Sequence, residues 1–321
     1  MSFRLPLLAA VALLASATPA SARHIVIGND DGLTANVKAL YEALKAEGHD
    51  VIVAVPCSQQ SGMGGALKMM RPLGPLAADC VNGAAKAGDP GAGPMTRAGL
   101  GKDFFYVDGT PVMAMLYGID VVANERWGGP PDLVLSGPNI GQNSGNIVVS
   151  SGTVSNVQYA IMRDIPAVAL SAGENSASGV DLANPLSSLV ATRSLELMHG
   201  LEAASHGGRL LPSGLALNVN FPDAPEAAKW KFTRIGSFMR YEFKFVSDLA
   251  SAAGKPPVEG QAPLPGLFAT VSRKTPDASE EGDEAAVAMK DISVSVLQAA
   301  YDAPAARRAE IEQRLDGLVR P

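Results

Sequence analysis

The feature that most constrains the fold of this chain is a short apolar run, a helical pattern and a second apolar run in close succession. "HIVIG" (24–28) is rich in β-formers, and "VIVAV" (51–55) has the uninterrupted apolar pattern of a strand buried on both faces of a sheet. Between them, apolar side chains recur at the spacing of one helical face until Gly48 ends the pattern. This order predicts a βαβ unit with two parallel strands and a right-handed crossover.

The same alternation continues along the chain. Further buried strands are predicted at 131–137, 166–171 and 214–222, with helical patterns between them, such as "TVSNVQYAIMRD" and "NPLSSLVATRSLELMHGLEAA". Such alternation is typical of an α/β fold with a mostly parallel sheet and helices on both faces. Ligands of such folds bind at the carboxyl ends of the strands.

The pattern loosens after Pro222. "KWKFTRI" and "RYEFKFV" are predicted to be antiparallel strands, "DISVSVL" (291–297) a strand with one solvated face, and "APAARRAEIEQRLDGL" a terminal helix. We interpret residues 223–321 as an arm on a core of about 23–222, so that 23–321 form a single domain. The Gly-, Ala- and Pro-rich stretch 81–101 is predicted to be a long surface insertion.

The first 22 residues have the pattern of a secretory signal peptide. Arg4 precedes an apolar stretch, and Ala20-Ser21-Ala22 matches the cleavage pattern, which leaves Arg23 as the first mature residue. The alternative is a membrane anchor, but the apolar stretch is shorter than the roughly 20 residues of a spanning helix. No later segment is predicted to span a membrane. We therefore expect a mature protein outside the cytoplasm, in a periplasm or secreted.

The charge of the chain argues against binding to a nucleic-acid backbone, and its cysteine content leaves the pairing of two thiols open. Without Arg4 the 26 basic residues become 25 against 32 acidic ones, a net charge of −7, and there is no basic stripe for a nucleic-acid backbone. An acidic protein that handles phosphate would need a metal ion to supply positive charge. Cys57 and Cys80 are compatible with a disulfide in an oxidising compartment and equally with two unpaired thiols.

Polar loops follow three of the predicted strands. Asp30 and Asp31 lie in "NDDG" directly after the first strand, a composition that is also ordinary for a turn. Ser61 follows the second strand, and Asn139 follows "PDLVLSG". Carboxylate, hydroxyl and amide oxygens are the ligands that Mg²⁺, Mn²⁺ and Ca²⁺ prefer. If the strands are neighbours, these loops converge into a site for a divalent cation.

A fourth loop, "SSGTV" (150–154), enters a predicted helix. Its hydroxyl groups and the free N–H groups of the helix start can bind a phosphate, although a plain helix cap explains the same residues. The sequence has no HExxH, GxSxG or Walker motif, and its four histidines fall outside these loops.

Five motifs in this order resemble the SurE family of survival-protein nucleotidases. They are "GNDDG", "QSGMG", "YVDGTP" (106–111), "PDLVLSGPNIGQNSG" (131–145) and "SSGTV" (150–154). The resemblance covers about residues 24–300. It implies a Rossmann-like three-layer α/β/α core with a C-terminal β-hairpin and helix arm. It also implies a metal-dependent phosphatase of nucleoside monophosphates, a 5′/3′-nucleotidase or acid phosphatase, that forms a homodimer or homotetramer with exchanged arms.

The resemblance also implies roles for single residues. One divalent metal per subunit, Mg²⁺ or Mn²⁺ with Ca²⁺ as an alternative, would be bound by Asp30, Asp31, Ser61 and Asn139. Asp30 or Asp31 would also orient or deprotonate the attacking water. Residues at which substrate or phosphate binding is expected are Asn29, Gly62, Asn143, Ser151, Gly152 and Thr153.

The sequence departs from the family pattern at several positions. Gly28 stands where the family has Thr, Cys57 where it has Asp, and Ile140 where a basic residue is expected; the His after the Ser-Gly loop is absent. Two alternatives therefore remain: an exported protein that binds a metal or phosphate ligand without turnover, and a metal-assisted hydrolase of another substrate.

Overall fold

The computed structural model of the chain describes residues 22–256 and 262–318, so the predicted leader lies, apart from Ala22, outside the described residues. The described residues build a nine-stranded sheet in the order β3-β4-β2-β1-β5-β6-β7-β11-β8 and a separate two-stranded sheet, β10-β9. The strands are β1 (His24–Gly28), β2 (Asp50–Pro56), β3 (Ala92–Pro94), β4 (Phe104–Val107), β5 (Leu133–Ile140), β6 (Ala167–Ala172), β7 (Leu215–Asn220), β8 (Trp230–Thr233), β9 (Tyr241–Val246), β10 (Gly266–Val271) and β11 (Ile292–Gln298). The α-helices are α1 (Ala35–Ala46), α2 (Pro111–Tyr117), α3 (Asn124–Trp127), α4 (Gly152–Met162), α5 (Pro185–Ser205), α6 (Leu249–Ala252), α7 (Glu284–Val287) and α8 (Ala305–Arg314).

The central strands are parallel, which confirms the predicted α/β architecture. β1 pairs with β2 on one side and with β5 on the other, both in parallel, and β6 and β7 continue the parallel order beyond β5. The antiparallel pairs of this sheet are β3 with β4 and β7 with β11. The chain therefore builds outward from β1 in both directions, and the β1–β5 boundary is the switch point at which such folds place their ligands.

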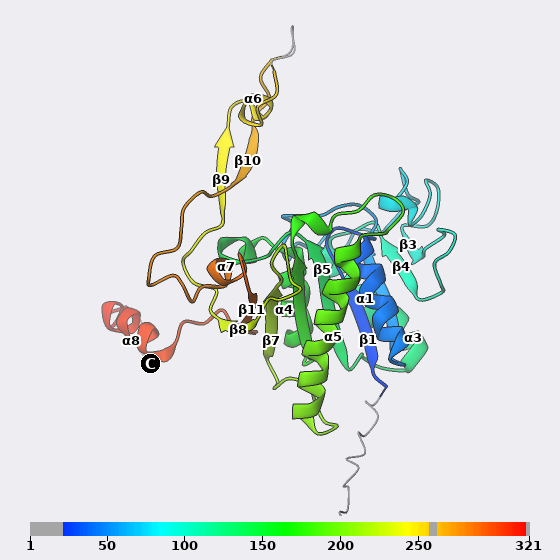
Figure 1. Ribbon diagram of the computed structural model, residues 1–321, viewed down its shortest axis with the longest axis horizontal. Coiled ribbons are helices and arrows are strands. Elements are labelled where there is room, and N and C mark those ends of the chain that lie inside the picture. Colours follow the sequence, from blue (N-terminus) through cyan, green and yellow to red (C-terminus); the bar gives the residue numbers. More distant parts are fainter. Residues whose placement is uncertain (1–21, 257–261, 319–321) are drawn as a thin grey trace, which may run out of the picture.

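Apolar side chains on both faces of the sheet explain why these strands are apolar throughout. Ile25 and Ile27 of β1 face a cluster that includes α1 and α5, whereas Val26 between them faces a cluster that includes α2 and α4. Each of these side chains is fully buried. Helices thus cover the sheet on both sides (Figure 1), and burial of each such side chain contributes about 1.5–3 kcal/mol.

The region after Pro222 differs from the prediction in its pairing. The strands predicted at "KWKFTRI" and "RYEFKFV" both form, but they do not pair with each other: β8 pairs in parallel with β11, and β9 pairs with β10. β10 was not predicted. The expected solvated face of "DISVSVL" is also wrong for most of β11, because this strand lies between β7 and β8 and its residues 292–295 are buried.

Within residues 223–321, the elements outside the main sheet include the ribbon β9–β10 and the helices α6 and α8. The β9–β10 ribbon with α6 projects away from the main sheet, and α8 lies apart from the core on another side (Figure 1). The predicted insertion, 81–101, is attached to the core, since its strand β3 pairs with β4 and its residues Ala84 and Ala85 are buried. In the described segments, no helix combines the length and the apolarity that crossing a bilayer requires.

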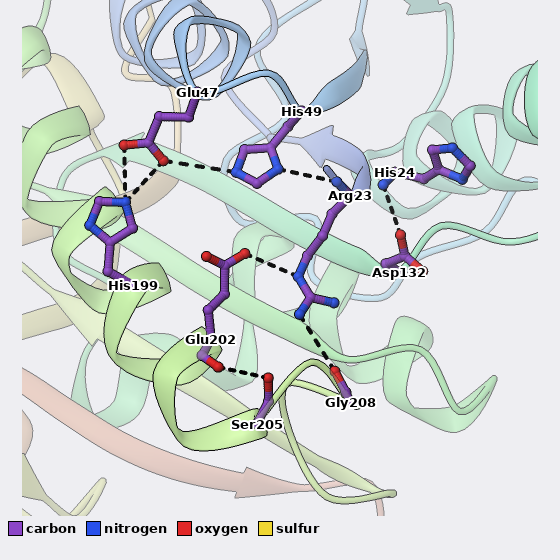
Figure 2. Close-up of polar contacts among 9 residues, drawn as sticks. All are labelled: Arg23, His24, Glu47, His49, Asp132, His199, Glu202, Ser205 and Gly208. Atoms are coloured by element: carbon purple, nitrogen blue, oxygen red, sulfur yellow. Dashed lines mark hydrogen bonds and ion pairs between the residues drawn. The ribbon is translucent and has the colours of Figure 1, made fainter. Parts of the chain in front are cut away.

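The amino ends of β1 and β2 carry a cluster of charged residues that pair with one another (Figure 2). The Arg23 Nε atom lies 3.1 Å from Glu202 Oε1, and the His199 Nε2 atom lies 3.0 Å from both Glu47 oxygens. The backbone N–H of Arg23 donates to His49 Nδ1 over 3.2 Å. Three of the four histidines thus belong to, or lie beside, this edge of the sheet, away from the carboxyl ends of the strands.

Candidate metal and phosphate site

The candidate site lies where β1 and β5 end side by side. Gly28 is opposite Ser136 in the parallel register, and the loop after β1 carries Asp30 and Asp31. β5 continues through a register shift to Asn139 and Ile140, the last residues of the strand. The loops on the two sides of a switch point diverge and leave a crevice between them. The two aspartates therefore lie at the position in this fold where a ligand has access to the sheet edge.

Asp30 is held by the start of α4. Its Oδ1 accepts a hydrogen bond from the Thr153 hydroxyl over 3.0 Å, and the backbone amides of Gly152 and Thr153 also donate to its carboxylate. A side chain at Gly152 would collide with this arrangement, because an added Cβ would lie 2.7 Å from Asp30 Cβ. Glycine at this position is therefore what allows the helix N-terminus, with its partial positive charge, to approach Asp30.

Asp31 is held from two other loops. Its Oδ2 accepts a hydrogen bond from the backbone N–H of Ile140 over 2.9 Å, and the Ser61 hydroxyl lies 3.4 Å from its Oδ1. The loop of Ser61 is in turn fixed to the site, since Gln60 N donates to Asp30 O over 2.8 Å. The structure thus brings together the four segments that the sequence analysis singled out: the loops after β1, β2 and β5, and the start of α4.

The two carboxylates are buried and have no cationic partner within residues 22–256 and 262–318. Asp30 is 2% exposed and Asp31 is 8% exposed. Burial raises the pKa of Asp30, against the opposing hydrogen bond from Thr153. Burial, followed by the neighbouring charge of Asp30, raises the pKa of Asp31 to about 7. Both shifts mean that the folded chain by itself disfavours two negative charges here, which a bound cation would reverse.

Two neutral oxygens beside the aspartates lack hydrogen-bond partners among the described residues. They are Oδ1 of Asn139 and Oδ1 of Asn29, and both side chains are nine-tenths or more buried. The Asn139 amide N–H groups donate to the carbonyls of Ile140 and Gly141, which leaves its oxygen free. A buried acceptor without a donor costs about 1–3 kcal/mol. These oxygens, with the two carboxylates and the Ser61 hydroxyl, form a ligand set that suits a hard divalent cation.

This ligand set is not a cluster of acidic or histidine side chains. In the described parts of the chain, no three His, Cys, Asp or Glu residues are arranged to hold a metal. The candidate site has two carboxylates and completes its set with hydroxyl and amide oxygens. Such sets suit Mg²⁺ or Mn²⁺, which bind one or two carboxylates and keep other positions for water and substrate oxygens.

The other predicted residues have mixed environments. Ser151 caps α4, because its hydroxyl accepts from Val154 N over 3.1 Å. Gly62 lies in an exposed turn with φ +83°. The Asn143 side chain donates to the Ser171 hydroxyl over 3.0 Å inside the protein. The helix start therefore already serves Asp30 and its own cap, and Asn143 connects the site loop to β6.

Two departures from the family pattern have structural explanations. Gly28 faces α2 and α4, since an added Cβ would lie 3.1 Å from Asn156 Nδ2 and 3.4 Å from Met115 Cβ. It is therefore a packing position behind the site. Ile140 contacts Asp31 through its backbone N–H, a contact that does not require a basic side chain.

The open question of the cysteines is resolved as a disulfide between Cys57 and Cys80. Cys57 follows β2 directly, and Val81 N donates to Cys57 O over 2.8 Å beside the bond. The disulfide therefore ties the insertion to the start of the loop that carries Ser61.

Sequence reasoning missed a buried acidic residue near the site loop. Glu284 accepts hydrogen bonds from Gly145 N and from Asn218 Nδ2, both over 2.9 Å. Burial raises its pKa to about 7. The signal in the sequence was weak, because Glu284 belongs to the acidic stretch "PDASEEGDEA", which is typical of a solvated surface.

The chain is similar to proteins of one known family. Residues 25–242 match the family model described as Survival protein SurE. The chain is also similar to the solved structure of SurE protein from Aquifex aeolicus, with a TM-score of 0.63 and 26% identity over 91% of this chain and 99% of that one.

Curated relatives carry enzyme names. A 5′/3′-nucleotidase SurE of Edwardsiella ictaluri is 32% identical over 88% of this chain and 93% of its own. A 5′-nucleotidase SurE of Thermosipho melanesiensis is 31% identical over 66% of this chain and 70% of its own. An acid phosphatase of Yarrowia lipolytica is 33% identical over 62% of this chain and 56% of its own.

Proposed function

The chain belongs to the SurE family of survival proteins, and we propose that it is a divalent-metal-dependent phosphomonoesterase that hydrolyses nucleoside monophosphates outside the cytoplasm. The observation that carries the proposal is the pair Asp30–Asp31, two adjacent buried carboxylates at the switch point of the sheet without a cationic partner in the described residues. The names of the relatives, 5′-nucleotidase and acid phosphatase, support the reaction class.

The residues present fit one Mg²⁺ or Mn²⁺ ion, with Ca²⁺ as an alternative. Asp30, Asp31, Ser61 and Asn139 would hold it, and the unpartnered Oδ1 of Asn139 supports this assignment. When bound, the ion supplies the positive charge that neutralises phosphoryl oxygens and makes a water molecule more acidic.

The chain's own groups perform the remaining steps. Asp30 is fixed by the hydroxyl and amides of α4, whereas Asp31 has a more loosely held oxygen, 3.4 Å from Ser61 Oγ. A carboxylate oxygen that the ion leaves free accepts the proton of the attacking water. At the start of α4 the Ser151 hydroxyl donates a hydrogen bond to a phosphoryl oxygen, since its own oxygen accepts from Val154 N. The Thr153 hydroxyl and the Gly152 and Thr153 amides hold Asp30 in place beside it. The water oxygen forms a bond to phosphorus as the ester bond from phosphorus to the nucleoside oxygen breaks. The nucleoside oxygen takes up a proton from solvent water, and the carboxyl group returns its proton to solvent.

The test is an activity assay on the mature protein, residues 23–321, freed of metal and supplied with Mg²⁺ or Mn²⁺. We expect phosphate release from mononucleotides with either ion, and almost none in a chelator or from Asp31→Asn. Asp120→Asn is the matched control, since Asp120 is an exposed residue paired with Arg163. Metal binding without phosphate release from any mononucleotide would instead identify a binding protein on this scaffold.

Export is part of the proposal. The leader pattern at 1–22 and the Cys57–Cys80 disulfide support it, because disulfides persist in oxidising compartments. Fractionation of the native host followed by N-terminal sequencing tests it. We expect Arg23 as the first residue outside the cytoplasm; an intact Met1 in the cytoplasmic fraction would contradict export.

Assembly into a homodimer or homotetramer with exchanged arms is also proposed. The projecting β9–β10 ribbon leaves Phe245 and Leu267 72% and 59% exposed, and an isolated two-stranded ribbon is marginally stable. A second copy that covers these side chains would account for both facts. Light scattering tests this: we expect a multiple of the subunit mass, and a smaller particle for a Phe245→Ser, Leu267→Ser double variant.

A further inference from the structure

A small cavity lies beside the candidate site, between the carboxyl ends of the strands and the base of the arm. It is lined mainly by Gln142, Glu174, Asp223, Arg240 and Tyr241. Its volume is about 70 Å³, which is room for roughly five water molecules. The cavity is therefore large enough for a small polar group and too small for a drug-sized ligand.

Two polar side chains of this cavity have unused hydrogen-bonding capacity. Gln142 is 5% exposed; its Nε2 donates to Phe221 O and Ala288 O, while its Oε1 has no partner within the described residues. The Nε of Arg240 is likewise buried and without a partner there. A buried acceptor and a buried donor line the same small space, which points to a ligand that can both donate and accept.

The cavity is connected to the candidate site through the end of β5. Ile140 donates to Asp31, and the next residue, Gly141, accepts from Asn139 Nδ2 over 2.8 Å. On its other side Gly141 lies against Glu174, whose Cγ would be 3.8 Å from an added Cβ. Gln142, which lines the cavity, is two residues after Ile140, whose backbone N–H contacts Asp31. Because successive Cα atoms are about 3.8 Å apart, the Cα atoms of Gln142 and Ile140 are at most about 7.6 Å apart.

The charges decide which ligand fits. The carboxylates of Glu174 and Asp223 can accept hydrogen bonds from a ligand. Their negative charge disfavours an anionic ligand such as phosphate. Arg240, 3.9 Å from Asp223, disfavours a metal cation. A neutral group with several hydroxyls satisfies all of them, because each hydroxyl donates to a carboxylate or to Gln142 and accepts from Arg240.

We propose that this cavity binds the ribose hydroxyls of the substrate, with the phosphate of the same nucleotide at the Asp30–Asp31 site. The inference rests on the proposed function and extends it, because it makes the chain selective for ribonucleotides over deoxyribonucleotides. Glu174 and Asp223 are the specificity-determining carboxylates. Both residues are exposed, so their substitution leaves the core intact.

The kinetic experiment compares AMP, dAMP and phenyl phosphate in the presence of Mn²⁺. We expect wild-type kcat/KM for AMP to exceed that for dAMP by roughly tenfold to a hundredfold, the range of one or two hydrogen bonds to a charged group. In Glu174→Gln and in Asp223→Asn, the ratio of AMP to phenyl phosphate should fall at least tenfold, and AMP should approach dAMP. Glu125→Gln, at an exposed position of α3, is the matched control and should keep the wild-type ratio.

A binding experiment separates this inference from the proposed function. Calorimetry with adenosine and 2′,3′-dideoxyadenosine needs no turnover; we expect adenosine to bind at least tenfold more tightly, and this difference to disappear in Glu174→Gln. Equal binding of the two nucleosides, no binding of adenosine, or an undiminished difference in Glu174→Gln would overturn the ribose site. Absence of phosphate release from every phosphomonoester would overturn the proposed function alone.

Discussion

Asp103 and Asp31 are buried to similar extents, with exposed fractions of 6% and 8%. They lie on opposite sides of one sheet: Asp103 where the amino ends of the parallel strands meet (the amino edge) and Asp31 where their carboxyl ends meet (the carboxyl edge). Asp103 precedes β4 at the amino edge, where it accepts hydrogen bonds from Arg126 Nη2 over 2.7 Å and from the Tyr41 hydroxyl over 2.8 Å. Burial acts to raise its pKa, but these partners outweigh burial and hold the pKa below its ordinary value. At the carboxyl edge, burial and Asp30 raise the pKa of Asp31 to about 7.

The same contrast holds for the neighbours of each residue. At the amino edge, Glu202 pairs with Arg23 and Glu47 with His199 (Figure 2). At the carboxyl edge, Asp30 has hydroxyl and amide donors and, within the described residues, no cation. The amino edge thus balances its charges with cationic side chains, whereas the carboxyl edge leaves two adjacent carboxyl groups without a cationic partner in the described residues. Proteins keep such strained arrangements at functional sites, where they cost stability.

The largest effect is expected when Asp31 is neutralised. Asp31→Asn should lower kcat/KM for mononucleotides about 10³-fold, or ~4 kcal/mol of transition-state stabilisation. Without metal it should also stabilise the fold by roughly 1–3 kcal/mol, because one of two repelling buried charges is removed. Steady-state kinetics and urea unfolding at pH 8 in a chelator measure the two changes. A variant that retains a tenth of the activity, or that unfolds more easily, would contradict the contrast between the edges.

Glu284 is a further buried carboxyl group with a raised pKa. Its pKa rises from an ordinary 4.5 to about 7, so between these values the unfolded chain loses a proton that the folded chain keeps. Stability should therefore fall as pH rises from about 4.5 to 7, by up to roughly 3 kcal/mol from this residue, and level off above pH 7. Urea unfolding between pH 5 and 7.5 measures the slope.

The control for this slope is a neutral side chain at the same position. The free energy of unfolding of Glu284→Gln should fall less steeply with rising pH than that of wild type. The exposed Glu125→Gln should have the same slope as wild type. If the slope of Glu284→Gln equals that of wild type, the buried carboxyl is not the source of the pH dependence.

Adding a metal should stabilise the carboxyl edge selectively. At a hundred times its Kd, Mn²⁺ should raise the free energy of unfolding of wild type by about 2.7 kcal/mol. Asp31→Asn should show much less of this gain, whereas Asp103→Asn should keep it in full, since Asp103 lies at the other edge. Thermal unfolding with and without Mn²⁺ gives the result, and an equal Tm increase in all three proteins would place the ion elsewhere.

The smallest effect on stability and activity is expected when a cation of the amino edge is removed. Arg126→Met removes the cation that contacts both Asp103 and Asp50. We expect a loss of about 2 kcal/mol, less than for a fully buried pair because the Arg126 side chain is 20% exposed. Turnover should stay within about twofold of wild type, since a surface change away from the site rarely alters chemistry. Urea unfolding and kinetics together check this; a large loss of activity would link the two edges.

Local pattern was sufficient to predict the core strands and the meeting of the site loops. The apolar runs of β1, β2 and β5 are long and bounded by turn residues, and parallel strands bring their carboxyl ends to one edge. Asp30, Asp31 and Ser61 could therefore be grouped from the sequence. The Ile140 amide that binds Asp31 could not be predicted, because any residue offers the same backbone N–H.

Features that depend on distant segments were not predictable. β10 pairs with β9 although α6 lies between them in the sequence, and β8 joins the sheet beside β11. No local periodicity specifies either pairing. The ribose cavity unites Gln142, Glu174 and Arg240 from three separate segments without a motif. Each of these side chains is unremarkable in its own stretch of sequence, and its meaning depends on the tertiary arrangement.

The Cys57–Cys80 bond has a consequence for how the protein is produced. It encloses a segment with a sequence separation of 23 residues, which includes the loop of Ser61. Closing a loop of this length lowers the conformational entropy of the unfolded chain, which raises the free energy of unfolding by about 3 kcal/mol. Chains made in a reducing cytoplasm keep that freedom, and their Ser61 loop must order without a tether. Oxidative folding is therefore the condition under which the Ser61 loop of the candidate site becomes ordered at the lowest entropic cost.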